Sequence, residues 1–308
     1  MNAHIPVLAR EAFEALAVQA DGLYIDATFG RGGHTALILG ALGLEGRVLA
    51  FDRDPAAIEA GHRRFPDEVR IALVGAPFAD IAARVQELAP SRPVRGILFD
   101  LGVSSPQLDD PTRGFSFRAD GPLDMRMDPS SGEPVSAWLA RAGESEIREV
   151  IATLGEERFA RRIAADIVAA RAREPLTRTL QLADLVARSV RTRDPGKNPA
   201  TRTFQALRMH VNDELGQLRS ALNGALGLLA VGGRLAAISF HSLEDRIVKQ
   251  FIQGHSTVDP VFAGLPLIPD SAQPRLKRLG SKTRAGEAEL AVNPRARSSV
   301  LRVAEKLR

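Results

Sequence analysis

Short apolar runs alternate with amphipathic stretches through the first third of the chain. Four runs have the continuous apolar character of buried strands, GLYIDA, RVLAFD, VRIALVG and RGILFD. The segments between them, HTALILGAL, PAAIEAGHRRF and FADIAARVQEL, repeat their apolar positions with helical spacing. Buried strands that alternate with helices predict a parallel sheet with right-handed crossovers. We therefore expect an α/β protein.

The alternation stops after Asp100. A loop rich in Pro, Gly and Asp follows at 102–134, far longer than an ordinary connection. Four helical patterns come next, VSAWLARAG, ESEIREVIATLG, EERFARRIAADIVAARAR and TLQLADLVARSV, and the loop RTRDPGKNPATRTF ends this region. The α/β pattern then resumes with a helix expected to stop at Gly232-Gly233 before a buried strand, and SSVLRVAEK is a last strand candidate. These features predict a discontinuous α/β domain, 1–105 and 213–308, with an inserted, mostly helical domain at 106–212.

Composition excludes several classes of protein and of binding site. The absence of cysteine excludes disulfides and Cys-ligated metals and favours a reducing compartment. No signal peptide or bilayer-spanning apolar segment is recognisable, so we expect a cytoplasmic protein without membrane contact. The six histidines have no metal-binding spacing, so no metal is expected. A homodimer stays open as an assembly state.

Charge is distributed unevenly along the chain. Residues 158–208 hold 12 basic and 4 acidic residues, a net of +8, and residues 271–308 hold 10 and 3, a net of +7. The stretch 106–157 has 5 basic and 11 acidic residues, a net of −6. Solvated helix faces are the ordinary explanation for one such block, but two basic blocks around an acidic stretch favour a nucleic-acid partner.

The first strand candidate leads into a glycine-rich turn, YIDATFGRGGHT. Gly30, Gly32 and Gly33 would let a ligand approach the backbone at the sheet edge where α/β proteins bind ligands. The spacing is G-x-G-G rather than the dinucleotide pattern G-x-G-x-x-G. Asp26, at the strand end, would repel a pyrophosphate but suits a ligand that carries an ammonium group.

The next three strand candidates end in residues that suit the other parts of such a ligand. Asp52 follows the second strand and can accept hydrogen bonds from both hydroxyls of a ribose. Phe78 follows the third and can pack on a flat base, and Asp100 ends the fourth. An amino acid end, a ribose and an adenine make up S-adenosylmethionine. The alternative is a structural turn whose acids only cap helices.

Longer motifs carry a family resemblance that extends from about residue 4 to residue 306. They are YIDATFGRGGHT, FDRDPAAI, ILFDLGVSSPQLDDPTRGFSFRADGPLDMRMDP, GEERFARRIA, NPATRTFQALRMHVNDEL, GGRLAAISFHSLEDRIVK and NPRARSSVLRVAEK. In this order they resemble the bacterial 16S ribosomal RNA cytosine-N4 methyltransferases, the MraW family. The resemblance implies a Rossmann-like class I S-adenosylmethionine-dependent methyltransferase sheet. It also implies methylation of the exocyclic amine of a cytidine in the decoding centre of 16S ribosomal RNA, within the small ribosomal subunit. The cofactor contacts that it implies are Gly32, Gly33, His34, Asp52, Phe78, Asp100 and Gln107.

The way in which the base is held is less familiar. Many amino-methyltransferases of bases carry Asn/Asp-Pro-Pro-aromatic after the fourth strand, whereas this chain has DLGVSS. Asp100, Ser104 and His241 are the candidate catalytic residues, because each follows a strand that ends at the expected crevice. The alternatives are that the serine caps its own backbone, and that Ser242 caps a helix while His241 supports a loop. The missing motif also favours a second hypothesis, a non-catalytic S-adenosylmethionine-binding RNA chaperone or regulator.

Two segments are candidates for RNA binding. The loop FSFRADGPLDMRMD combines aromatic rings with guanidinium groups, as single-stranded RNA recognition requires. Its ordinary alternative is a structured loop in which the aromatic rings are anchors, and Trp138 is expected to be core. The second segment is the basic loop after the helical region. The candidate substrate-binding residues are Arg113, Phe115, Phe117, Arg118, Arg126, Arg191, Arg193 and Lys197.

Overall fold

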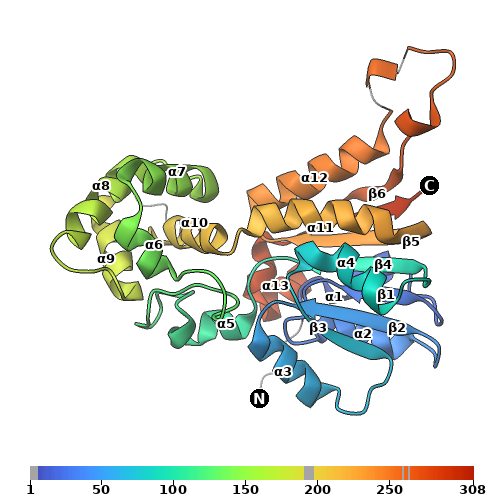
Figure 1. Ribbon diagram of the computed structural model, residues 1–308, viewed down its shortest axis with the longest axis horizontal. Coiled ribbons are helices and arrows are strands. Elements are labelled where there is room, and N and C mark those ends of the chain that lie inside the picture. The colour runs from blue at the N-terminus through green and yellow to red at the C-terminus, as the bar shows by residue number, and fades with distance from the viewer. Residues whose placement is uncertain (1–5, 191–197, 259, 263) are drawn as a thin grey trace. The chain divides into compact units, whose positions relative to one another are not determined.

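A computed structural model describes residues 6–190, 198–258, 260–262 and 264–308 (Figure 1). The chain divides into two compact units. The sheet unit is Met1–Gly102 with Leu215–Arg308, and the helical unit is Val103–Glu214. No helix of the described residues has both the length and the apolar character that a membrane span needs.

The sheet unit is built on one seven-stranded sheet, in the order β3-β2-β1-β4-β5-β7-β6. The first five strands in the chain are parallel, whereas β7 pairs antiparallel with both β5 and β6. The α/β fold expected from the apolar runs is thus confirmed. The strands are β1 (Leu23–Asp26), β2 (Arg47–Asp52), β3 (Ile71–Gly75), β4 (Val94–Asp100), β5 (Leu229–Ser239), β6 (Leu276–Thr283) and β7 (Val300–Lys306).

Helices cover both faces of this sheet, which explains why the central strands are apolar throughout rather than alternating. One hydrophobic core joins one face of the sheet to α4 (Ile81–Leu88), α11 (Glu214–Leu228) and α12 (Ser242–Ser256). A second core joins the other face to α1 (Ala9–Leu16), α2 (Gly33–Ala41), α3 (Pro55–Arg64) and α13 (Glu287–Val292) (Figure 1). Short 3-10 turns complete the unit at Phe78–Asp80, Pro260–Phe262, Asp270–Ala272 and Pro294–Ser298.

The expected helix stop at Gly232-Gly233 is wrong, because both glycines lie inside β5. The strand begins at Leu229, which pairs with Val94, and the register shifts before Gly96 pairs with Arg234. Gly232 has φ +78°, and a Cβ at Gly233 would lie 2.9 Å from two backbone carbonyl oxygens. The glycines therefore form an irregularity within the strand, where side chains would not fit.

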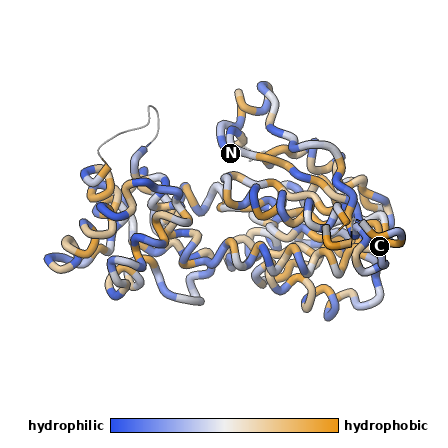
Figure 2. Tube along the Cα trace, turned by 90° about the horizontal axis from the view of Figure 1, so that it is seen from above, coloured by the Kyte–Doolittle hydropathy of each residue, from blue (hydrophilic) through white to orange (hydrophobic). Residues whose placement is uncertain are grey.

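The helical unit holds α5 (Ser105–Asp109), α6 (Val135–Arg141), α7 (Glu144–Gly155), α8 (Ala160–Arg171), α9 (Thr179–Ser189) and α10 (Thr201–Val211), with a 3-10 turn at Pro111–Arg113. Hydrophobic and hydrophilic residues alternate along these helices (Figure 2). Their apolar faces form one core, and Trp138 lies in it, as expected. The end of the loop expected at 191–204 is helical instead, since α10 starts at Thr201. Its first turn holds Phe204 in the core, a contact that no local pattern indicates.

Candidate active site

The sheet changes direction between β1 and β4. From β1 the chain proceeds outward through β2 and β3, and then returns to place β4 and β5 on the other side of β1. Asp26 and Asp100 are the last residues of these two neighbouring strands. A switch point of this kind opens a crevice at the carboxyl ends of the strands, where α/β proteins bind ligands.

The glycine turn after β1 is tightly packed. Gly32 has φ +69°, and a Cβ there would lie 2.6 Å from the ring of Phe29 and 2.9 Å from that of Phe65. Only glycine fits this position, because the backbone is left-handed and two aromatic rings close over it. The turn leads directly into α2, so the first N–H groups of that helix follow the glycines.

Asp52 is fixed by the same turn. Its Oδ2 accepts a hydrogen bond from the Gly30 N–H (2.8 Å), and its Oδ1 accepts one from the Asp54 N–H (2.9 Å). Burial raises the pKa of Asp52 to about 6, although these two backbone donors act in the opposite direction. Each oxygen keeps a second lone pair, so the carboxylate can still accept hydroxyl groups from a ligand.

Asp100 lies opposite His34, from the first turn of α2. His34 Nε2 is 3.4 Å from Asp100 Oδ2, which is an ion-pair distance but not a good hydrogen bond. Burial lowers the pKa of His34, but Asp100 and the charges of Asp26 and Glu289 raise it, and the net shift is upward. Asp100 Oδ1 has no hydrogen-bond partner among the described residues. An acceptor without a donor is unusual in native proteins and indicates a place for a ligand group.

Asp26 is buried, 1% exposed, and both of its oxygens are used within the protein. Thr35 Oγ1 donates to Asp26 Oδ2 (2.6 Å), and the Thr28 N–H donates to Asp26 Oδ1 (3.1 Å). Burial raises the pKa of Asp26. These contacts tie the end of β1 to α2 and so hold the glycine turn in place.

Phe78 lies after the end of β3, the strand next to β2. It begins the 3-10 turn after β3 and is partly exposed. Its ring packs edge-on against Phe99, with 6.0 Å between the ring centroids. One aromatic surface is thus held at the carboxyl edge of the sheet.

Comparison with known proteins assigns this chain to a protein family. Residues 1–307 match the MraW methylase family. The chain belongs to that family. The resemblance inferred from the motifs is confirmed, and S-adenosylmethionine, the methyl donor expected from the sequence, is the donor of this family.

Individual relatives align with nearly the whole chain. Ribosomal RNA small subunit methyltransferase H of Dechloromonas aromatica (strain RCB) is 55% identical over 307 residues, which is 99% of each chain. The protein of the same name from Thioalkalivibrio sulfidiphilus (strain HL-EbGR7) is 55% identical over 306 residues, 99% of this chain and 98% of its own. A solved rRNA methylase from Streptococcus thermophilus aligns over 99% of this chain and 100% of its own, with a TM-score of 0.46 and 14% identity.

Two other expected site residues belong to the helical unit, where they form a helix cap. Ser104 is the N-cap of α5, and its N–H donates to Gln107 Oε1 (2.9 Å). The Ser104 side chain accepts from the Gln107 N–H in return. This reciprocal pair is a capping box, as in the capping alternative for the serine. A role for either residue at the methyl donor stays a prediction.

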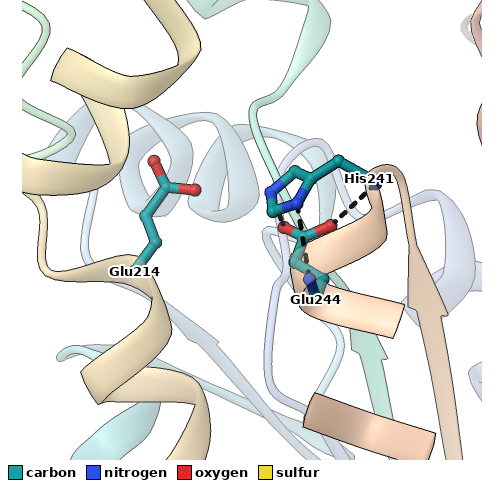
Figure 3. Close-up of side chains that lie close together, drawn as sticks. All are labelled: Glu214, His241 and Glu244. Carbon is teal, nitrogen blue, oxygen red and sulfur yellow. Dashed lines mark hydrogen bonds and ion pairs between the residues drawn. The ribbon is translucent and has the colours of Figure 1, made fainter. Parts of the chain in front are cut away.

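His241 also serves as a cap (Figure 3). It is the N-cap of α12, and its Nδ1 accepts from the Glu244 N–H (3.4 Å), so the cap is His241 and not Ser242. Glu244 Oε2 accepts from the Phe240 N–H (2.8 Å), and Glu244 Oε1 lies 3.1 Å from His241 Nε2. The third side chain in Figure 3, Glu214, pairs within its own unit with Arg208 (2.7 and 2.8 Å). Both ring nitrogens of His241 thus face Glu244, and a catalytic role for His241 stays a prediction.

Neither unit by itself holds three described His, Asp or Glu side chains grouped closely enough to bind a metal ion.

In the aromatic and basic loop of the helical unit, the rings pack on the core of that unit and two of the arginines bind the loop itself. Phe115 is 6% exposed in the core, and Phe117 packs edge-on against Phe204 at 4.9 Å. Arg113 donates to the carbonyl oxygens of residues 126 and 127, and Arg126 forms a two-pronged pair with Asp124 (2.8 Å each). These placements fit the loop-anchor alternative for the rings.

Of the other candidates for RNA binding, Arg118 is described by the structure and three basic residues are not. Arg118 is exposed, and its guanidinium group has no ion pair with any described residue. Arg191, Arg193 and Lys197 lie outside the described residues.

Two hydroxyl groups at the strand ends were not predicted from the sequence. Thr28 Oγ1 accepts a hydrogen bond from the Asp100 N–H (2.6 Å) and so joins the ends of β1 and β4. Ser239, the last residue of β5, is 1% exposed, and its Oγ has no partner among the described residues. Thr28 follows Asp26 by two positions within the glycine motif, which is the one local signal that could have singled it out.

Proposed function

We propose that this chain transfers the methyl group of S-adenosylmethionine to the exocyclic N4 amine of a cytidine in the decoding centre of 16S ribosomal RNA, within the small ribosomal subunit. The observation that carries the proposal is the pair of carboxylates at the carboxyl ends of β2 and β4, the strands on either side of β1. There Asp52 is held by two backbone donors while Asp100 keeps an acceptor oxygen without a donor. The names of the relatives support ribosomal RNA as the substrate class.

The residues present suit the parts of the donor. Asp52 would accept the ribose hydroxyls, because both of its oxygens are oriented and still have free lone pairs. Phe78 would pack on the adenine. The glycine turn leads into α2, so the first N–H groups of that helix would be available to the carboxylate of the methionine end.

The methyl group arrives from a sulfonium centre, which makes it electrophilic. In a cytosine, the lone pair of the amine is delocalised into the ring, so the amine is a poor nucleophile. Asp100 Oδ1, which has no donor among the described residues, would accept a hydrogen bond from that amine and so orient its lone pair toward the methyl carbon. The N–C bond would form as the S–C bond breaks, which leaves a neutral thioether, and the proton that the amine loses would pass to solvent water. His34 and Thr28 hold Asp100 from two sides during this step.

Methyl transfer to the proposed substrate tests this function directly. Small ribosomal subunits isolated from cells that lack this gene would be incubated with the purified chain and isotopically labelled S-adenosylmethionine. We expect one labelled nucleotide, a cytidine modified at N4 in the decoding centre, identified by nuclease mapping and mass spectrometry. Label on another base or another atom would contradict the assigned position. Donor binding without any transfer to RNA would favour the non-catalytic chaperone or regulator instead.

A further inference from the structure

The edge strand β6 carries an irregularity that no part of the proposed chemistry uses. Leu279 pairs with Val303, and the next pair on β6 is Thr283 with Leu301. Residues 280–282 therefore stand opposite Arg302 alone and bulge out of the ladder. Gly280 adopts φ +68° in this bulge. Bulges of this kind at sheet edges often redirect side chains toward a functional surface.

Cationic side chains from three elements surround the bulge. A hollow of about 30 Å³ is lined by Lys249 of α12, Arg278 of β6 and Arg302 of β7, together with Gln253 and Ser281. Figure 1 shows α12 and β6 side by side, and their residues are in contact. A hollow of this size holds about one water-sized group. It can therefore take a single anionic oxygen, whereas an aromatic ring or a nucleoside would not fit.

The positive charge at this hollow is only partly neutralised. Arg302 forms a two-pronged pair with Asp245 (2.6 and 3.0 Å). The side chains of Lys249 and Arg278 are exposed and form no ion pair or hydrogen bond with any residue that the structure describes. Residues 275–284 carry five basic side chains and no acidic one. The surface thus offers two free cations to an anionic partner.

Edge strands often carry basic residues merely to prevent pairing with another sheet edge. That explanation covers Arg278 but not Lys249, which comes from a helix, or Arg302, which comes from an interior strand. A cluster gathered from three elements around one hollow indicates binding of an anion rather than protection of a strand edge.

The strand register gives the distance of this cluster from Asp100. Arg278 pairs with Ala304, Ala304 with Leu235, and Leu235 with Ile97, which lies three residues before Asp100 on β4. Three strand spacings across the sheet, about 14 Å, and three residues along a strand, about 10 Å, place the backbones of Arg278 and Asp100 about 17 Å apart. A strand of nucleic acid with its phosphates about 3.4 Å apart along the axis spans this distance with roughly five nucleotides.

We propose that Lys249 and Arg278, supported by Arg302, bind backbone phosphates of the substrate RNA a few nucleotides from the target base. This inference rests on the proposed function for the identity of the RNA. The contact would fix the position of the strand along the sheet edge without reading its sequence, since phosphate contacts carry no base information.

Binding to small ribosomal subunits from cells lacking this gene, measured over a range of salt concentrations, tests the inference. The double variant Lys249→Gln/Arg278→Gln should lower the slope of log affinity against log salt by about 1.4–1.8, or 0.7–0.9 for each lost phosphate. Its KM for subunits should rise, with turnover at saturation unchanged. The matched control is Arg63→Gln/Arg84→Gln, which removes the same charge from exposed side chains paired with Glu59 and Glu87. The control should keep the slope of the unaltered chain.

Equal slopes for the double variant and the unaltered chain would overturn the inference, even if methyl transfer proceeds. Self-association of the double variant with an unchanged slope would overturn it too, in favour of edge protection. Because binding is measured without turnover, absence of methyl transfer by the unaltered chain would contradict the proposed function alone. A lower slope in the double variant would still support the anion site.

Discussion

Asp52 offers the sharpest test of the proposed donor site, because its environment predicts both a mutational effect and a pH dependence. Asp52→Asn keeps the shape of the side chain but replaces one acceptor oxygen with an NH2 group. That group would face a backbone N–H, of either Gly30 or Asp54, and could accept no ribose hydroxyl. Loss of one hydrogen bond to a charged group costs about 1.5–3 kcal/mol, so donor affinity should fall by roughly 10- to 150-fold.

The pH dependence follows from the raised pKa of Asp52, about 6. Ribose binding needs the ionised carboxylate, so affinity should fall as pH decreases through 6. It should be about tenfold weaker at pH 5 than at pH 7.5. The stability of the fold depends on pH in the opposite direction, because the folded chain holds the proton of Asp52 more tightly than the unfolded chain does. The contribution of Asp52 to the free energy of unfolding is greatest below its ordinary pKa of 3.8 and is lost as pH rises through about 6.

Titration calorimetry with S-adenosylmethionine at both pH values measures these effects on the unaltered chain and on Asp52→Asn. The variant keeps His34, whose pKa is also raised, so any pH dependence that remains in it belongs to other groups. The variant should lose most of the tenfold change. Unaltered affinity in the variant with an intact fold would refute the ribose contact, and equal pH dependence in both proteins would refute the titration argument.

Three further predictions concern catalysis, folding and RNA binding. Asp100→Asn should reduce turnover at saturating donor by about 100-fold in the methyl transfer assay, and full turnover there would limit Asp100 to donor binding. Gly233→Ala should lower the free energy of unfolding in urea by about 1–3 kcal/mol, because its Cβ would meet two carbonyl oxygens at 2.9 Å. The control is Gly227→Ala in α11, where no atom lies within 4 Å of the new Cβ, and it should raise that free energy by up to about 1 kcal/mol. A similar loss of free energy of unfolding in both variants would contradict the packing argument. Replacement of Arg191, Arg193 and Lys197 with alanine should lower the salt slope of RNA binding by about 0.7–0.9 per phosphate contact and leave donor affinity intact. An unchanged slope would exclude these three side chains from the interface.

The helix caps show how one local pattern can fit two structures. Serine and glutamine three residues apart, as in Ser104 and Gln107, are a capping signal and also part of the family motif. The same ambiguity applies to the strand end at His241, where the structure uses the histidine itself as the cap. Spacing alone could not separate the two roles, because a cap and a ligand contact both need a polar side chain at the start of a helix.

Local patterns in the sequence predict the parallel half of the sheet, the interruption after Asp100 and the residues at the strand ends. Strands buried on both faces are continuous apolar runs, and the acids and glycines that follow them stand out against that background. The motifs were also long enough to identify the family. All of these signals are local, so they can be recognised without knowing which segments meet in space.

Contacts between distant segments of the chain cannot be predicted from such local patterns. β6 has the polar sequence LKRLGSKT and becomes a strand because it pairs with β7, which follows it in the chain. Thr28 binds the backbone of Asp100 from 72 residues away, and the orientation of Asp52 depends on Gly30, 22 residues before it. Phe115 is buried because helices that follow it in the chain pack around it. Pairing and burial of this kind depend on the partner that each segment finds on folding, and no local pattern of side chains contains that information.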